Sequence, residues 1–184
     1  NKYKYIEDGN LLEKEIIKIN ENGGEENMNE DEKCLYTRYL YYCAQSYNDA
    51  SKFNDLLYLN KALKYYNLVI ENKNSWNEEK YISCIELCYY YAKEKNYDKY
   101  LYYILLSEKY NKNERIELIC ELFKYCINFE NYSLAKQFYD KYKNYNENNY
   151  TLNKYLFIKL EYYNGLFEYL YSLCAKHNDD YTEG

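Results

Sequence analysis

Proline is absent from this 184-residue chain, and glycine, histidine and tryptophan are scarce, with five, one and one residues. A collagen-like chain needs glycine at every third position, so that class is excluded. Valine occurs once and threonine three times, and no alternating apolar run is bounded by turn residues, so strand signals are nearly missing. No stretch approaches the ~18 uninterrupted apolar residues of a membrane span. We therefore expect an all-α fold and no membrane span.

A positive charge excess is also missing. The chain has 24 Lys and Arg against 30 Asp and Glu, a net charge of −6, with both signs interleaved along its length. The tyrosines around Arg38 over 36–47 are compatible with base stacking, but the net acidity opposes contact with phosphates. We therefore expect no nucleic-acid partner.

The seven cysteines are odd in number and irregularly spaced, which argues against a disulfide framework and for a reducing, cytoplasmic compartment. Cys84 and Cys88 lie four residues apart and would share one helix face, as zinc ligands can. A second pair of soft ligands is missing, because the only histidine, His177, lies close to the C-terminus. Small apolar core residues are the favoured interpretation, and no metal site is predicted.

Catalytic motifs are lacking as well. Gly23-Gly24 is followed by Glu25-Glu26, whose charge would repel a phosphate group. A nucleophile would need a base within hydrogen-bond reach, and His177 lies in a polar tail. No Asp-x-Asp motif that would hold a nucleotide sugar occurs. The prediction is no cofactor and no catalytic residue.

Tyrosine is what the chain has in abundance, with 31 residues, and apolar side chains recur at helical spacing almost throughout. Asn, Asp and Ser lie at the joints, where they can cap helices and close turns. The helices are predicted at residues 3–19, 32–48, 57–71, 78–95, 97–110, 114–129, 132–145, 152–163 and 166–176. The predicted organisation is a linking helix at 1–22, an acidic, solvated loop at 23–31, a helical-repeat domain at 32–177 and a polar tail at 178–184.

The helices from residue 32 onward come in pairs with an internal repeat. Ala62, Tyr100 and Ala135 occupy equivalent positions in successive second helices and are 38 and 35 residues apart. The tetratricopeptide repeat has a period of about 34 residues. We therefore predict a right-handed α-solenoid of antiparallel, tetratricopeptide-like helix pairs, with small residues at the close helix crossings.

A more specific resemblance begins at Arg38–Asp49, which reads Arg-Tyr, an aromatic step, and then Ala-Gln-Ser-Tyr with Asp close behind. Ala62-Leu63 with Tyr65-Tyr66 follows, then Trp76-Asn77-Glu78-Glu79, and then Arg115 with Glu117. In this order the segments resemble the tetratricopeptide-like region that follows the catalytic domain in family-two glycosyltransferases of giant viruses and some bacteria. Nearly the whole chain takes part in the resemblance.

The resemblance implies a non-catalytic binding or scaffold domain of a glycosyltransferase-like protein, with a protein segment or a glycan acceptor as partner. The N-terminus lacks a Met and an apolar signal core, so we expect a piece of a longer protein. Two alternatives stay open: a stand-alone viral or parasite adaptor that captures a host protein, and glycosyltransferase activity in the parent chain. The candidate binding residues, expected on the concave face that first helices line, are Tyr39, Gln45, Tyr89, Lys93, Arg115 and Lys124.

Overall fold

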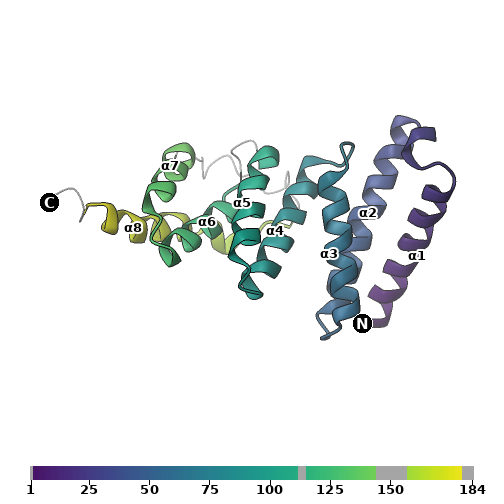
Figure 1. Ribbon diagram of the computed structural model, residues 1–184, viewed down its shortest axis with the longest axis horizontal. Helices are drawn as coiled ribbons and strands as arrows, with labels where there is room; N and C mark the ends of the chain where they lie inside the picture. The colour runs from purple at the N-terminus through teal and green to yellow at the C-terminus, as the bar shows by residue number, and fades with distance from the viewer. Residues whose placement is uncertain (1, 112–114, 144–156, 180–184) are drawn as a thin grey trace. The chain divides into compact units, whose positions relative to one another are not determined.

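The computed structural model describes residues 2–111, 115–143 and 157–179, and these residues form helices, turns and loops without a strand. The all-α prediction is thus confirmed for the described part of the chain. The elements, coloured from purple to yellow in Figure 1, are α1 (Lys2–Glu21), η1 (Gly24–Asn27), α2 (Glu30–Ser51), α3 (Leu56–Glu71), α4 (Asn77–Lys93), α5 (Tyr97–Asn111), α6 (Glu117–Asn128), α7 (Tyr132–Tyr142), η4 (Leu160–Tyr163) and α8 (Leu166–Asp179).

The predicted helices agree with these bounds within a few residues, with one exception. The helix expected at 152–163 is wrong in its described part, because residues 157–159 are not helical and only the 3-10 turn η4 follows. Residues 152–156 lie outside the described part. Phe157 has a φ of 50°, a left-handed conformation that interrupts any helix at this point.

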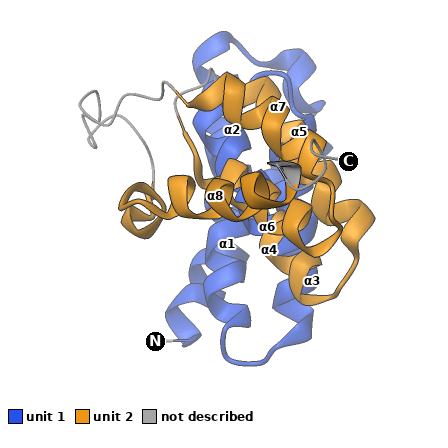
Figure 2. Ribbon diagram, turned by 90° about the vertical axis from the view of Figure 1, so that its left-hand side faces the viewer, with its two compact units in different colours: residues 1–87 blue, residues 88–184 orange. Residues whose placement is uncertain are grey.

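The chain divides into two compact units, residues 1–87 and 88–184, shown in blue and orange in Figure 2. The division falls within α4. In the first unit α2 packs against both α1 and α3. Its core is rich in phenol rings and small side chains, among them Tyr41, Tyr47, Tyr65, Ala44 and Ala62.

Polar residues begin helices in both units, as predicted. Asn29 forms a capping box with Glu32 at the start of α2, and Asp55 accepts a hydrogen bond from the backbone N–H of Leu57. Asn131 does the same for α7 through Leu134 N–H. These side chains satisfy backbone donors that have no partner inside the helix.

The acidic segment at 23–31 is more ordered than the solvated loop that we predict from its composition. It contains η1, and α2 begins at Glu30. The Glu25 carboxylate accepts hydrogen bonds from the side-chain amides of Asn72 (2.8 Å) and Asn74 (3.1 Å), which follow α3. We name these three residues the Glu25 clasp; it ties the turn after α1 to the turn after α3.

The second unit is built around α6, which contacts α5, α7 and α8. Its residues 117–123 are all buried, so side chains on every face of its first two turns are enclosed. A helix enclosed on all sides is central to its domain. Two of these buried residues are the acids Glu117 and Glu121.

The three positions predicted to be equivalent in the repeat are all buried: Ala62 on α3, Tyr100 on α5 and Ala135 on α7. Among the described residues, no helix is both long enough and apolar enough to cross a membrane.

Candidate functional site

The six residues predicted from the sequence fall into two groups. Tyr39 and Gln45 lie half-buried on α2 of the first unit. The other four lie in the second unit. Three of them, Tyr89, Arg115 and Lys124, lie close to the buried carboxylates of α6. The fourth, Lys93, is exposed at the end of α4.

Glu121 is the centre of the larger group. Its Oε1 accepts hydrogen bonds from the Tyr162 hydroxyl (2.7 Å) and the Lys124 ammonium (2.6 Å), and its Oε2 accepts one from the Tyr100 hydroxyl (2.9 Å). The Tyr89 hydroxyl lies 2.8 Å from that of Tyr162. Because Tyr162 donates to Glu121, Tyr89 is the donor in this pair. We call these five residues the Glu121 cluster.

Glu117 lies one helical turn before Glu121 and holds a second set of donors. Arg115 donates from Nη2 to Glu117 Oε1 (2.6 Å) and from Nε to Oε2 (3.3 Å), and the Tyr163 hydroxyl donates to Oε2 (2.8 Å). The side chains of Arg115 and Glu117 are 1% and 0% exposed. Arg115 is therefore a buried structural partner here, in contrast to the expectation that it lies on an open binding face.

Tyr162 and Tyr163 belong to a short segment, residues 157–163, that we call the strap. Within the strap, the backbone N–H of Tyr162 bonds to the carbonyl of Lys159 and closes the turn η4. The Lys159 ammonium lies 3.9 Å from the centre of the Tyr89 ring, a close cation–π contact. The strap thus places its cation on the Tyr89 ring and donates one phenol hydroxyl to each of the two α6 carboxylates.

The phenols of the cluster keep their protons. Burial, together with the charge of Glu121, raises the pKa of Tyr100 and of Tyr162 well above the ordinary value of 10. Burial also raises the pKa of Tyr89. The hydroxyls therefore stay hydrogen-bond donors, an arrangement suited to holding a segment in place.

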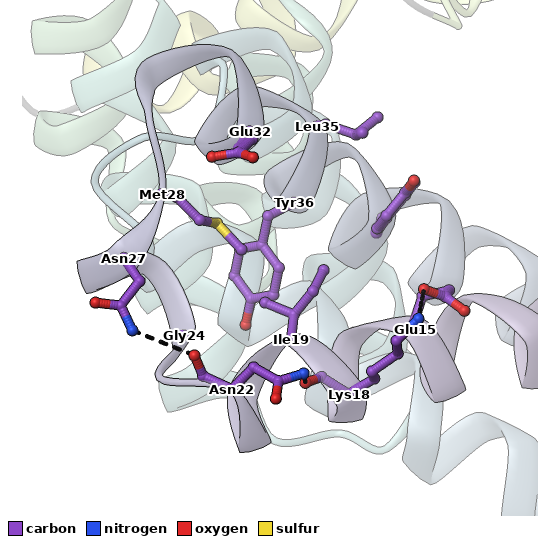
Figure 3. Close-up of a pocket in the computed structure, with 11 residues that line it drawn as sticks. Glu15, Lys18, Ile19, Asn22, Gly24, Asn27, Met28, Glu32, Leu35 and Tyr36 are labelled. Atoms are coloured by element: carbon purple, nitrogen blue, oxygen red, sulfur yellow. Dashed lines mark hydrogen bonds and ion pairs between the residues drawn. The ribbon is translucent and has the colours of Figure 1, made fainter.

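A second candidate surface, in the first unit, includes Tyr39. A pocket of about 350 Å³ opens between the end of α1, η1 and the start of α2 (Figure 3). Its polar residues contact each other: Lys18 pairs with Glu15, and the Asn22 side chain donates to the Lys18 carbonyl. The lining residues are Glu15, Lys18, Ile19, Asn22, Gly24, Asn27, Met28, Glu32, Leu35, Tyr36 and Tyr39.

An adjoining groove of about 530 Å³ runs between α1 and α2 and shares Leu35 and Tyr39 with the pocket. Its lining includes the exposed side chains Leu11 and Tyr42. Pocket and groove together present a continuous apolar and aromatic surface on the first unit.

Metal-ligating side chains do not cluster in the described part of the chain, where no three His, Cys, Asp or Glu residues are placed to hold an ion. Cys84 and Cys88 are both buried, as the packing interpretation predicts. Burial raises the pKa of Cys84, which keeps it a neutral apolar side chain.

The sequence interpretation misses Glu117, Glu121 and Tyr162, which hold the site together. It searches for exposed residues, whereas these three are buried. One signal for the acids is present: two glutamates four residues apart in the otherwise apolar run Ile116–Phe123. Charged residues inside an apolar run are buried only with partners, so their spacing marks a polar site on one helix face.

Comparisons of the chain with protein-family models, with curated proteins and with solved structures return no match. The geometry of the strap, the Glu121 cluster and the α1–α2 surface therefore carries the functional argument.

Proposed function

We propose that this chain is a non-catalytic helical-repeat binding domain, a right-handed α-solenoid of antiparallel, tetratricopeptide-like helix pairs. The repeat positions Ala62, Tyr100 and Ala135 support this architecture, because all three are buried on second helices at a nearly constant period. A solenoid of this kind exposes one face of its helices to partners.

One observation carries the binding role: side chains of α4, α5 and α6 hold the strap, a segment outside the α-helices, by specific polar contacts. Tyr89, Tyr100 and Glu121 form an arrangement of donors and acceptors that receives the phenol of Tyr162. The same chemistry suits a segment of another protein, because a phenol supplies apolar area and a hydrogen-bond donor together.

The chemistry of the buried acids supports a non-catalytic role. Glu117 and Glu121 are buried, and both accept hydrogen bonds from cationic and phenolic donors. A general acid or base has to exchange protons with a substrate, whereas these carboxylates are buried and hydrogen-bonded to side chains of the domain itself.

We further propose that the domain is part of a glycosyltransferase-like protein and positions a protein segment or a glycan acceptor. The support is the ordered series of motifs in Arg38–Asp49, Ala62–Tyr66 and Trp76–Glu79. A catalytic domain with an Asp-x-Asp motif encoded upstream favours this parent, whereas a start codon close to Asn1 favours the adaptor alternative.

Panning a random peptide library over the immobilised chain tests the binding role. Selected peptides, labelled with a fluorophore, should bind saturably, and Tyr39→Ala or Tyr89→Ala should weaken binding by about tenfold or more, as for an aromatic hot spot. The matched control is Lys14→Ala, an exposed change on α1. Failure to enrich any peptide that binds saturably contradicts the proposal.

A nucleotide-sugar turnover assay on the chain tests the non-catalytic part. No hydrolysis or transfer is expected with uridine- or guanosine-diphosphate sugars. Turnover above a boiled control contradicts the proposal and supports the enzymatic alternative.

A further inference from the structure

We propose that the strap is an internal ligand that occupies the binding surface of the second unit, and that the external ligand is a peptide carrying Lys-x-x-Tyr-Tyr, the chemistry of Lys159–Tyr163. This inference rests on the proposed binding function and names the partner chemistry for one of its surfaces.

The contacts of the strap show what the surface selects. Lys159 lies on the Tyr89 ring, Tyr162 donates to Glu121, and Tyr163 donates to Glu117. The two acceptors lie four residues apart on α6, so one helix face receives two successive phenols. Each of the three contacts is made by a side chain, and each can be reproduced by a second peptide of the same sequence pattern.

The strap is only partly covered by the rest of the second unit. Phe157 and Leu160 are 55% and 52% exposed, so much of its apolar surface stays in contact with solvent. Phe157 also adopts a left-handed backbone conformation that is costly for a non-glycine residue. The hydrogen bonds of Tyr162 and Tyr163 and the cation–π contact of Lys159 are contacts that an external peptide of the same pattern can replace.

An internal ligand competes at a high effective concentration, about millimolar for a short connection. A peptide with the same contacts therefore binds weakly while the strap is in place. Loosening the strap without changing the surface beneath it should reveal the full affinity.

The experiment uses the full chain and a fluorescent peptide of residues 157–165, Phe-Ile-Lys-Leu-Glu-Tyr-Tyr-Asn-Gly. In the Tyr162→Phe/Tyr163→Phe variant the strap keeps its rings and loses both hydroxyls. The peptide should bind this variant at least about tenfold more tightly than the wild type, because each lost hydrogen bond to a carboxylate weakens the internal competitor. The matched control is Tyr169→Phe, an exposed tyrosine on α8, which should leave peptide affinity unchanged.

The same peptide with Phe in place of both Tyr should not bind. Equal binding of this peptide, or equal affinity of the Tyr peptide for variant and wild type, overturns the inference.

A second measurement applies where the double variant does not fold. Excess Tyr peptide should accelerate hydrogen exchange at the backbone amides of residues 157–163 in the wild-type chain, and the Phe peptide should not. Absence of this acceleration overturns the inference. If it fails while library-selected peptides bind at Tyr39, the proposed function stands and only the role of the strap falls.

Discussion

Each of the two units contains a carboxylate that accepts hydrogen bonds from two phenols and one lysine. In the first unit Glu13 on α1 receives Tyr47 (2.7 Å) from α2, and Lys61 (2.5 Å) and Tyr65 (3.1 Å) from α3. In the second unit Glu121 receives Tyr100 and Lys124 from helices, but Tyr162 from the strap.

The same polar arrangement connects different kinds of segment in the two units. Around Glu13 every donor lies on a helix that is fixed by its own apolar packing, so the group connects three helices. Around Glu121 one donor, Tyr162, lies on the strap, outside any α-helix. The Glu121 side chain is also more buried, with 7% exposed against 19% for Glu13.

The largest effect is expected at the buried ion pair of the second unit. Arg115→Met leaves the Glu117 charge uncompensated in the interior, which should cost about 3–5 kcal/mol of unfolding free energy. Hydrogen exchange should localise the loss to the second unit. Arg115→Met/Glu117→Leu should recover most of it, because both charges are then absent. A loss below about 1 kcal/mol, the value of an exposed pair, would contradict the buried geometry.

The first unit should be most sensitive at Gly9 on α1. A Cβ atom at this position would lie 2.7 Å from Cε1 of Tyr47, and that ring is held by hydrogen bonds from its hydroxyl to Asn10 and Glu13. Alanine usually stabilises a helix interior by about 1 kcal/mol over glycine. Here the overpacking should outweigh this gain and lower the free energy of unfolding by about 1–3 kcal/mol, as measured by denaturant unfolding.

Lys14→Ala, at an exposed position of the same helix, is the control for Gly9→Ala and should change stability little. A stabilised Gly9→Ala variant would show that the Tyr47 ring moves freely. The donors around Glu13 would then not be rigidly fixed, and the contrast with the Glu121 cluster would be lost.

Much of this fold is predictable from sequence because the signals are local. Apolar periodicity places the helices, and Asn29, Asp55 and Asn131 mark helix starts through hydrogen bonds that span two or three residues. These interactions are determined within a few residues of chain, so no tertiary information is needed.

The strap and the Glu121 cluster are not predictable in this way. The apolar spacing over 152–163 favours a helix, but the conformation of 157–163 is fixed by contacts with residues 41 and 46 positions away. Likewise Arg115 and Glu121 are charged, so the sequence alone favours an exposed position for both until their partners are known. Tertiary contacts override local preference where polar side chains from distant segments meet.

A medium-sized effect is expected from acidification, and it should separate the two units. Partial burial alone would raise the pKa of Glu13, but hydrogen bonds from Lys61, Tyr47 and Tyr65 outweigh it and lower the pKa below the ordinary 4.5. The ionised carboxylate therefore stabilises the fold fully above about pH 4.5, and this contribution is lost as the pH falls through the folded-state pKa.

Glu13→Gln should accordingly lower the melting midpoint of the first unit at pH 7. The midpoint of the variant should also fall less on acidification than that of the wild type. The melting midpoints of wild type and variant are measured between pH 7 and pH 3. Hydrogen exchange then shows whether the loss of stability lies in the first unit. Parallel curves for the two proteins would contradict a lowered pKa.

The smallest effect concerns thiol reactivity, and it reports opening of each unit. Cys34 in the first unit is exposed, and the other six cysteines are buried. Burial raises the pKa of Cys43 and of Cys126 to about 12, and that of Cys174 to about 11. N-ethylmaleimide at pH 7 should add once per native chain and seven times in denaturant, as counted by mass spectrometry. Rapid labelling of Cys126 or Cys174 would show that the second unit opens easily.

The Glu25 clasp bears on the order in which the first unit assembles. Most contacts among α1, α2 and α3 join helices that are neighbours along the chain, whereas the clasp joins residues 47 and 49 positions apart through amide hydrogen bonds. Closing such a long loop before the hairpins form would cost entropy that two amide hydrogen bonds do not return. The clasp should therefore form after the folding transition state, so that its strength sets how slowly the first unit unravels and leaves its rate of formation almost unchanged.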